Sequence, residues 1–308
     1  MENILILGGA GYTGSALTHL LVKKKYNVTV VDNFLFKEDV FNTLFKFENF
    51  NVIKKDVRDI EESFIKKFDV IFPLAAIVGA PACEKYKFDA ISINKDSLKK
   101  ICLYTSKDQR IIYPTTNSGY GATSGEIECD ENTPLNPISL YGKIKKEVED
   151  IVMSRENSIS FRLATVFGVA PRHRTDLLVN DFVYKAMNDR SLVLFEENFK
   201  RNFVHVDDVA EAYLYSLEKF SELKNNIYNL GLSTANLTKK ELALKIKEYL
   251  PNTEIISSEI GKDPDKRNYI VSNKKIEDAG FTAKRSLDLG IKELIKYYSF
   301  ITKKNSNI

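Results

Sequence analysis

The first half of the chain alternates short apolar runs with longer segments whose apolar residues recur at helical spacing. The runs predict strands over residues 3–8, 27–32, 51–57, 69–76, 110–115 and 158–164. The periodic segments predict helices over residues 13–25, 91–107 and 141–154. Strands separated by helices form right-handed crossovers, and unbroken apolar runs are typical of strands buried on both faces. The pattern therefore predicts an α/β fold with a parallel sheet between two layers of helices.

After about residue 165 the rhythm changes. Short apolar runs now separate helical segments at 176–188, 207–220, 239–250 and 286–300. We predict a doubly wound, Rossmann-type domain over residues 1–165, to which later segments return. Residues 166–302 are expected to form mainly a smaller α/β lobe. Residues 303–308, at the C-terminal end, are expected to form a disordered tail.

Composition and charge exclude several classes of function. The 45 basic residues are spread along a chain of net charge +3, which argues against a nucleic-acid partner. Cys83, Cys102 and Cys129 are odd in number and the histidines are not clustered, so neither disulfides nor a metal site is expected. A strand begins within three residues of the N-terminus, and no apolar run reaches the ~18–20 residues of a membrane span. We expect a cytoplasmic protein with no membrane partner.

The segment "ILILGGAGYTGSAL" places Gly8, Gly11 and Gly14 between the first strand and the first helix. A tight turn, a close approach to a pyrophosphate and a helix–strand contact each need a residue without a Cβ atom. The helix N-terminus then offers N–H groups to the anion. Asp32 ends the second strand, where its carboxylate can accept the adenosine ribose hydroxyls and would repel a 2′-phosphate. We therefore expect NAD, with Asp56 as a weaker candidate for a contact to the adenine.

A second signal is the pair Tyr141 and Lys145, four residues apart on one face of a predicted helix. A phenol titrates near pH ~10 in water, and a fixed ammonium beside it favours the phenolate. Tyr141 could then take a proton from a substrate alcohol while hydride leaves the same carbon. The alternative is an ordinary helix face, which we set aside because the pair follows a dinucleotide-binding pattern.

The stretch "YPTTNSGYG", residues 113–121, follows a strand and contains no carboxylate. Ligands of open α/β sheets lie beyond the carboxyl ends of the strands, where Thr115 and Thr116 stand. A hydroxyl there can hydrogen-bond the reacting oxygen and share its proton with Tyr141. We expect one of the two threonines to cap the turn instead.

These residues occur together in the order and spacing of a known family. The matching motifs are "GGAGYTG", Asp32, "LAA" at 74–76, Asn94, "TTNSGYG", Tyr141 with Lys145, "FRLATVFG" and "RNFVHVDDVA". Over about residues 1–295 the chain resembles the extended short-chain dehydrogenase/reductases, and within them the NAD-dependent nucleotide-sugar epimerase/dehydratase family. The resemblance implies an enzyme with Thr116, Tyr141 and Lys145 as catalytic residues.

The resemblance also implies that residues 166–302 are mainly the lobe that binds the nucleotide sugar, and it implies which residues bind the ligands. The implied cofactor-binding residues are Gly8, Gly11, Tyr12, Thr13, Gly14, Asp32, Asn33, Asp56, Val57, Leu74, Ala75, Ala76, Asn94, Thr115, Tyr141, Lys145, Ala164 and Val166. The implied substrate-binding residues are Val78, Gly79, Ala80, Thr116, Asn117, Ser118, Thr165, Arg174, Asn180, Arg201 and Arg267. Besides these, His173 lies in a basic loop and could line the sugar site together with Arg172 or Arg174.

Asn117 and Ser118 stand where the 4,6-dehydratases of the family carry an aspartate and a glutamate. Elimination of water needs an acid and a base, and neither an amide nor a hydroxyl titrates near neutral pH. The stretch therefore favours oxidation of a sugar hydroxyl, most directly the 4-hydroxyl. Whether the ketone is released by a 4-dehydrogenase or reduced from its other face by a 4-epimerase stays open. A dehydratase with carboxylates from elsewhere and a non-catalytic NAD-binding regulator are further alternatives.

A narrower similarity concerns the segments "PLAAIVGAPAC", "YPTTNSGYG", "DLLVNDF" and "DPDKRNYIVS". Together they resemble the GDP-D-glycero-α-D-manno-heptose 4-dehydrogenases of bacterial capsule polysaccharide synthesis. We therefore expect a nucleotide-diphosphate sugar as substrate, with a GDP-sugar favoured. The family resemblance also implies a homodimer formed through the helices predicted over 91–107 and 141–154.

Overall fold

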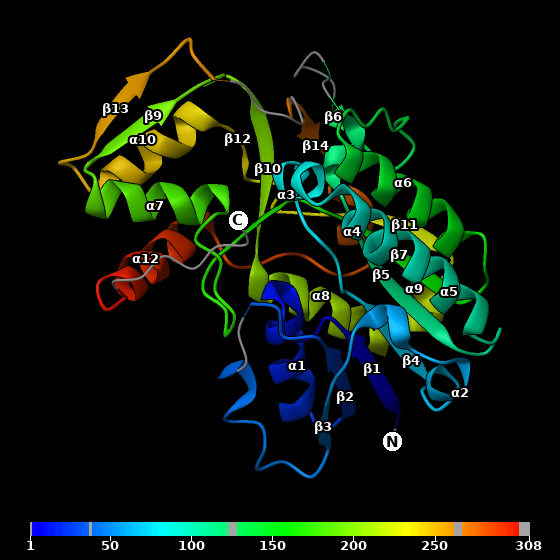
Figure 1. The fold of residues 1–308 in the computed structure, drawn as a ribbon. Coiled ribbons are helices and arrows are strands. Elements are labelled where there is room, and N and C mark those ends of the chain that lie inside the picture. Colours follow the sequence, from blue (N-terminus) through cyan, green and yellow to red (C-terminus); the bar gives the residue numbers. More distant parts are fainter. Residues whose placement is uncertain (1, 37–38, 122, 124–127, 262–266, 302–308) are drawn as a thin grey trace.

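The computed structural model describes residues 2–36, 39–121, 123, 128–261 and 267–301. Its largest feature is a parallel sheet in the order β11-β7-β5-β4-β1-β2-β3 (Figure 1). The strands are β1 (Asn3–Leu7), β2 (Asn27–Asp32), β3 (Phe50–Lys54), β4 (Val70–Pro73), β5 (Arg110–Thr116), β7 (Ser158–Leu163) and β11 (Asn226–Leu230). Strand order reverses between β1 and β4, which places a ligand crevice at their carboxyl ends. The predicted doubly wound α/β fold is confirmed.

Helices cover both faces of this sheet. One face packs against α1 (Tyr12–Lys23), α8 (Val206–Glu218), α9 (Phe220–Leu223) and α11 (Lys274–Asp278). The other packs against α2 (Glu62–Ile65), α3 (Ala80–Lys85), α5 (Ser97–Tyr104) and α6 (Leu140–Met153). Strand side chains are buried on both faces, as in Ile6 and Leu7, which belong to opposite clusters. This two-sided burial explains the unbroken apolar runs in the sequence.

The helix predicted over residues 91–107 differs from the observed one. The chain forms α4 (Lys87–Ile91), then a π-helical turn over Ser92–Asp96, then α5. Such turns widen a helix locally and often accompany functional residues. Here the turn contains the buried Asn94. Helical periodicity alone carries no signal for this widening.

The second lobe has its own core, formed where helices pack on short strands. Its main elements are α7 (Leu178–Asn188), β9 (Ser191–Leu194), α10 (Lys239–Tyr249), β13 (Glu254–Ser257) and α12 (Leu287–Tyr298). Small sheets join the lobes: β12 (Asn236–Thr238), β10 (Lys200–His205) and β8 (Thr165–Phe167) form one, and β14 (Ile270–Val271) and β6 (Glu128–Cys129) form another. Single 3-10 turns lie at Asp39–Phe41, Val57–Asp59 and Asn117–Tyr120.

The chain crosses between the lobes repeatedly. β10 lies between β8 and β12, α8 then packs on α1, and β11 joins the edge of the large sheet beside β7. The division at residue 165 therefore stays a prediction about function rather than a single break in the chain. The predicted tail, 303–308, lies outside the described residues.

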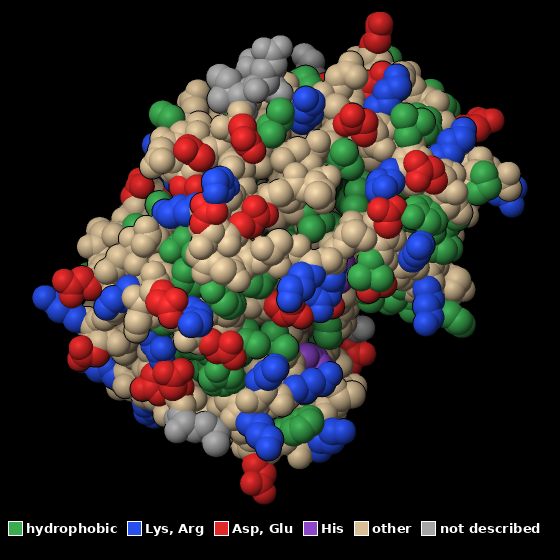
Figure 2. All heavy atoms as spheres, turned by 180° about the vertical axis from the view of Figure 1, so that it is seen from behind, with side chains coloured by type: hydrophobic (Ala, Val, Ile, Leu, Met, Phe, Trp, Pro, Cys, Tyr) green, Lys and Arg blue, Asp and Glu red, His purple; other side chains and the backbone are tan. Residues whose placement is uncertain are grey.

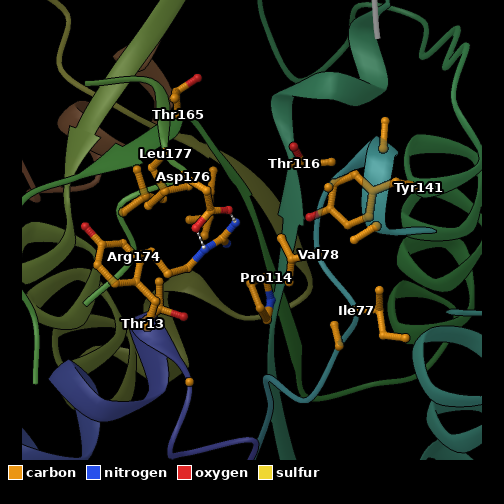
Figure 3. Close-up of a pocket in the computed structure, with 18 of the residues that line it drawn as sticks. Thr13, Ile77, Val78, Pro114, Thr116, Tyr141, Thr165, Arg174, Asp176 and Leu177 are labelled. Carbon is orange, nitrogen blue, oxygen red and sulfur yellow. Dashed lines mark hydrogen bonds and ion pairs between the residues drawn. The ribbon is translucent and has the colours of Figure 1, made fainter. Parts of the chain in front are cut away.

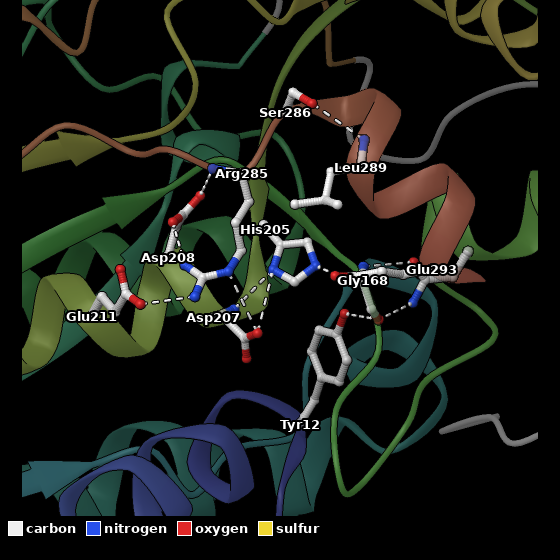
Figure 4. A network of polar contacts seen from close by, with 11 residues as sticks. Tyr12, Gly168, His205, Asp207, Asp208, Glu211, Arg285, Ser286, Leu289 and Glu293 are labelled. Atoms are coloured by element: carbon white, nitrogen blue, oxygen red, sulfur yellow. Dashed lines mark hydrogen bonds and ion pairs between the residues drawn. The ribbon is translucent and has the colours of Figure 1, made fainter. Parts of the chain in front are cut away.

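A polar network at the lobe junction surrounds the fully buried His205 (Figure 4). Its Nδ1 accepts a hydrogen bond from the N–H of Asp207 (3.2 Å), so Nε2 carries the proton and donates to Glu293 (2.9 Å). A Cβ atom on Gly168 would lie 2.3 Å from Nε2, so the loop needs glycine there. The ring therefore joins β10 to α12 in a structural role.

Acidic and basic side chains intermingle over the face shown in Figure 2. No helix among the described residues is long and apolar enough to cross a membrane. The same described residues contain no group of three or more His, Cys, Asp or Glu side chains that could hold a metal ion.

A buried ion pair fastens α6 to the sheet. Arg162 on β7 donates from Nη2 to Oε1 of Glu149 on α6 (2.8 Å), and both side chains are almost fully buried. Ser160 also donates to the carboxylate (3.2 Å), and Nη1 of Arg162 donates to the Tyr120 hydroxyl (3.1 Å). The pair is hydrogen-bonded on both sides, so removing one member would strand a buried charge.

We predict that Glu149→Leu lowers the free energy of unfolding by about 3–5 kcal/mol, because the Arg162 guanidinium then lies buried without its carboxylate. Adding Arg162→Met should restore most of that loss. Urea unfolding followed by circular dichroism would measure both. The matched control is Asp278→Asn, which breaks an exposed pair with Lys274 and should cost less than about 0.5 kcal/mol. Equal losses in the exposed and buried variants would contradict the prediction.

Candidate active site

A cavity of about 560 Å³ lies between the carboxyl ends of the large sheet and the second lobe. Every residue predicted to bind cofactor or substrate lines it except Gly14, Asn94, Asn117 and Asn180. The residues come from segments far apart in the sequence, so the fold assembles one site from separate motifs.

The glycine loop leaves room for a ligand by bringing two backbones together. Gly8 has φ +81°, and a Cβ atom there would lie 2.4 Å from the amide nitrogen of Ala75. A Cβ atom on Gly14 would lie 2.4 Å from the carbonyl oxygen of Gly8, which explains why this residue faces the strand rather than the cavity. The loop leads into the N-terminus of α1, where Gly11 is the N-cap. This arrangement fits a dinucleotide pyrophosphate.

Asp32 is held in place at the end of β2. Its Oδ2 accepts a hydrogen bond from the N–H of Ala10 (2.9 Å), and its Oδ1 accepts from Phe34 (2.8 Å). Burial raises the pKa of this carboxyl. The carboxylate lines the cavity beside the glycine loop, as an acceptor for ribose hydroxyls requires. Asp56 also lines the cavity, and its hydrogen bonds from Arg58 lower its pKa.

Asn94 lies behind the cavity wall. Its Oδ1 accepts from the N–H of Ile77 (2.8 Å) and its Nδ2 donates to the carbonyl of Ile77 (2.7 Å). The amide therefore holds the segment after β4, whose residues Val78 and Ala80 line the cavity. Direct contact between Asn94 and a cofactor stays a prediction.

Tyr141 and Lys145 lie on α6 with both side chains almost fully buried, and both line the cavity. Nζ of Lys145 donates to the carbonyl oxygen of Pro114 on β5 (2.9 Å). Burial lowers the pKa of Lys145 to about 8. Figure 3 shows the Tyr141 ring directed into the cavity near Thr116. The pair thus lies beside the strand end, as its sequence position indicates.

The threonine that caps the turn is Thr116, the one to which the family resemblance assigns a catalytic role. Its Oγ1 accepts a hydrogen bond from the N–H of Ser118 (3.2 Å) and so caps the 3-10 turn. The hydroxyl hydrogen remains available for a ligand. Thr115 is buried and also lines the cavity. Asn117 is not among the residues that line the cavity, and neither polar atom of its buried amide has a hydrogen-bond partner.

Asn180 organises the wall on the lobe side. It is fully buried, its Oδ1 accepts from the N–H of Gly168 (3.0 Å), and its Nδ2 donates to the carbonyl of Arg174 (2.7 Å). The Tyr12 hydroxyl donates to the Gly168 carbonyl (2.7 Å), which ties the glycine loop to the same segment. The amide therefore positions Arg174, and its contact with substrate stays a prediction.

Arg174 faces Tyr141 and Thr116 across the cavity (Figure 3). Its guanidinium forms an ion pair with Asp176, on the same segment. Burial would raise the pKa of Asp176, but the hydrogen bond and charge of Arg174 outweigh it and lower the pKa. Arg172 also lines the cavity and lies over the Phe36 ring (4.5 Å). Asp32 and Asp176 both lie near enough to stabilise the charge of Arg172, so the two guanidinium groups stand with two carboxylates on this wall.

His173, between these arginines, is absent from the cavity wall. Its Nε2 hydrogen-bonds with the Tyr298 hydroxyl (2.7 Å), and its ring packs on Tyr297 (4.4 Å between centroids). Burial lowers its pKa to about 4. The histidine therefore anchors the segment to α12 while its neighbours reach the cavity.

Sequence reasoning missed residues at the far end of the cavity. Arg201 and Arg267 reach it as expected, but Lys239 on α10 and Phe195 after β9 also line it. Nζ of Lys239 lies 4.3 Å from the centre of the Phe195 ring and donates to its carbonyl (2.8 Å). Nothing in the local pattern distinguishes this lysine from an exposed one, because it packs against a residue 44 positions earlier in the chain.

The carboxylates on the described part of the cavity wall all have partners. Asp32 accepts two backbone hydrogen bonds, and Asp56 and Asp176 bind arginines. Asp181 on α7 pairs with Lys185 (2.7 Å). None of the four adjoins Thr116 in sequence, so this wall lacks the adjacent acid and base that elimination uses.

Comparison with known proteins agrees with this arrangement. The model of the NAD dependent epimerase/dehydratase family matches residues 4–231. A protein of Bacillus subtilis named as an uncharacterised UDP-glucose epimerase is 28% identical over 245 residues, covering 74% of this chain and 76% of its own. Human dTDP-D-glucose 4,6-dehydratase is 25% identical over 324 residues, covering 96% of this chain and 90% of its own.

A solved structure supports the fold independently. UDP-glucuronic acid 4-epimerase from Bacillus cereus, in complex with UDP-glucuronic acid and NAD, matches with a TM-score of 0.85 at 20% identity. The match covers 96% of this chain and 99% of that one. The likeness therefore extends through both lobes.

We predict that Gly8→Ala abolishes dinucleotide binding and lowers the free energy of unfolding by at least about 2 kcal/mol, because the new Cβ meets backbone in a left-handed conformation. Calorimetric titration with NAD and urea unfolding would measure the two effects. Gly119→Ala is the control, since its Cβ would meet only the movable Leu135 side chain, at 3.2 Å. Wild-type NAD affinity in Gly8→Ala would show that the loop does not hold the cofactor.

Proposed function

The chain belongs to the NAD-dependent epimerase/dehydratase family of enzymes, and we propose that it oxidises the 4-hydroxyl of a nucleotide-diphosphate sugar to a ketone. The observation that carries the proposal is the composition of the wall around Thr116. Tyr141 and Lys145 line the cavity there, whereas the positions after Thr116 are Asn117 and Ser118. These side chains suffice for alcohol oxidation and lack the titratable pair that dehydration needs.

In this proposal each of the named cavity residues has a distinct role. Tyr141 takes the proton of the sugar hydroxyl, and the ammonium of Lys145 stabilises the phenolate that accepts it. Thr116 donates its hydroxyl hydrogen to the same sugar oxygen. The glycine loop would hold NAD, which would supply the acceptor for the hydride, a proton with two electrons, that leaves the sugar carbon. Arg174, Arg201 and Arg267 offer guanidinium groups to the diphosphate.

The specific substrate we put forward is GDP-D-glycero-α-D-manno-heptose, as used in capsule polysaccharide synthesis. Its support is the resemblance of four segments, each of which contributes residues to the cavity wall: Val78 from the first, Thr116 from the second, Asp176 from the third and Arg267 from the last. The names of the relatives instead carry UDP and dTDP sugars. A cytoplasmic setting, where sugar nucleotides are available, is part of the same proposal.

A 4-epimerase is the second candidate, because several relatives carry epimerase names. Both reactions begin with the same oxidation, and they differ in whether the ketone leaves or turns over within the cavity. The side chains described above serve either outcome.

We predict that a panel of GDP-, UDP- and dTDP-linked hexoses and heptoses contains a substrate whose addition changes the reduced-nicotinamide absorbance of the enzyme. Mass spectrometry should show a product lighter by two hydrogens for a dehydrogenase. A product of unchanged mass with inverted C4 would instead establish the epimerase. Loss of water would contradict the proposed oxidation as the net reaction.

In the same assay Tyr141→Phe should lower turnover at least about 10²-fold, while NAD binding and thermal unfolding stay unchanged. Tyr86→Phe, at an exposed tyrosine between α3 and α4, is the control.

We further propose that the enzyme is a homodimer, with the edge formed by α4 and α5 at the interface. Phe88 and Leu103 lie on this edge with 84% and 82% of their surface exposed. Lys95 and Lys99 both bind Glu147, so α5 and α6 lie side by side as one surface. Large exposed apolar side chains beside a rigid pair of helices suit contact with a second copy.

The double variant Phe88→Glu, Leu103→Glu should therefore be monomeric, because charge replaces the apolar contact. Size-exclusion chromatography with light scattering would report the mass. Leu244→Glu, on α10 in the other lobe, should leave the assembly unchanged. A wild-type protein that is monomeric at micromolar concentration would reject the dimer.

A further inference from the structure

Tyr113 lies directly beneath the catalytic lysine but outside the cavity wall. It is on β5, with 1% of its surface exposed, and Nζ of Lys145 lies 4.6 Å from the centre of its ring. Its hydroxyl has no hydrogen-bond partner, so a hydrogen bond of the phenol does not explain why this position carries a tyrosine. Burial raises its pKa well above the ordinary value, which keeps the phenol neutral. The ammonium therefore meets an aromatic face rather than an anion.

The other groups near this ammonium give it little compensating charge. Tyr141 lies one turn away on α6, and the Cys83 thiol on α3 favours the charged amine. Glu149, one turn further along α6, is bound in the ion pair with β7. A cation removed from water needs compensation, and the face of an aromatic ring supplies it when the centroid lies within ~6 Å.

We propose that the ring face of Tyr113 is a positioning and charge-stabilising element of the active site, holding Lys145 as an ammonium at the end of β5. The inference rests on the role of Lys145 in the proposed function. It adds a residue that touches neither substrate nor cofactor and acts through the lysine.

The ring compensates for desolvation. Burial, partly offset by the Cys83 thiol, lowers the pKa of Lys145 to about 8. The negative potential of the ring face favours the charged form and so shifts the equilibrium towards ammonium. Without the ring, the lysine would become neutral at lower pH, and the Tyr141 phenolate would form only at higher pH. The pH range in which Lys145 is charged and Tyr141 is a phenolate would then become narrower at both its acidic and its alkaline end.

Lys145 can be titrated without any substrate. In holoenzyme labelled with 13C at lysine Cε, the Lys145 resonance is identified by its loss in Lys145→Met, and its midpoint is followed against pH. Tyr113→Phe should keep the wild-type midpoint, because the hydroxyl has no partner. Replacing Tyr113 with a ring-fluorinated phenylalanine keeps the shape but removes the negative potential. That variant should titrate about one pH unit lower, as should Tyr113→Leu.

The fluorinated variant separates charge stabilisation from packing. If only packing matters, it and Tyr113→Phe will titrate alike, and the proposal is overturned. Should Tyr113→Leu fail to fold, these two variants still decide. A failure of the sugar panel would reject the proposed reaction while leaving this titration intact. Where a substrate is found, the alkaline limb of its pH–rate profile should move with the titration midpoint.

Discussion

The buried ammonium of Lys145 is the group on which the proposed oxidation depends. Between α6 and β5, Nζ of Lys145 donates a hydrogen bond to the carbonyl oxygen of Pro114 (2.9 Å). Because this amine is buried away from water, each contact that favours its charged form has a larger effect than the same contact at the surface. The basicity of the Tyr141 phenol then depends on whether the neighbouring amine is charged. The fold makes this contact possible, because it packs Lys145 on α6 against Pro114 near the carboxyl end of β5.

Amide side chains build the scaffold around this centre. Asn94 holds the segment after β4, and Asn180 holds the segment that carries Arg174. Each amide donates and accepts at once, so it fixes a loop in both directions without a net charge. The Tyr12 hydroxyl joins the second segment to the glycine loop. The cofactor end and the sugar end of the cavity are therefore mechanically connected through buried hydrogen bonds.

Much of this could be predicted from local patterns. Apolar runs and helical spacing specify the large sheet, and the glycine spacing with Asp32 specifies the loop. The direction of a side chain is different, because tertiary packing decides it. Asn180 occupies the expected place in the sequence yet uses its amide on the backbone, and Asn117 is not among the residues that line the cavity. Lys239 is held at the site by Phe195, 44 residues earlier in the chain, and no local signal marks it.

The chain crosses between the lobes several times, and this limits how far the lobes can move relative to one another. A two-domain protein joined by one linker opens like a hinge, since few dihedral angles need to change. Here β10, β11 and the segments around them connect the lobes in parallel, and His205 with Glu293 binds α12 to the junction. A rigid swing would have to bend all of these connections at once. Ligand entry is therefore expected to rely on rotation of cavity side chains and on the short segment around Arg174, with the two halves keeping their mutual orientation throughout turnover.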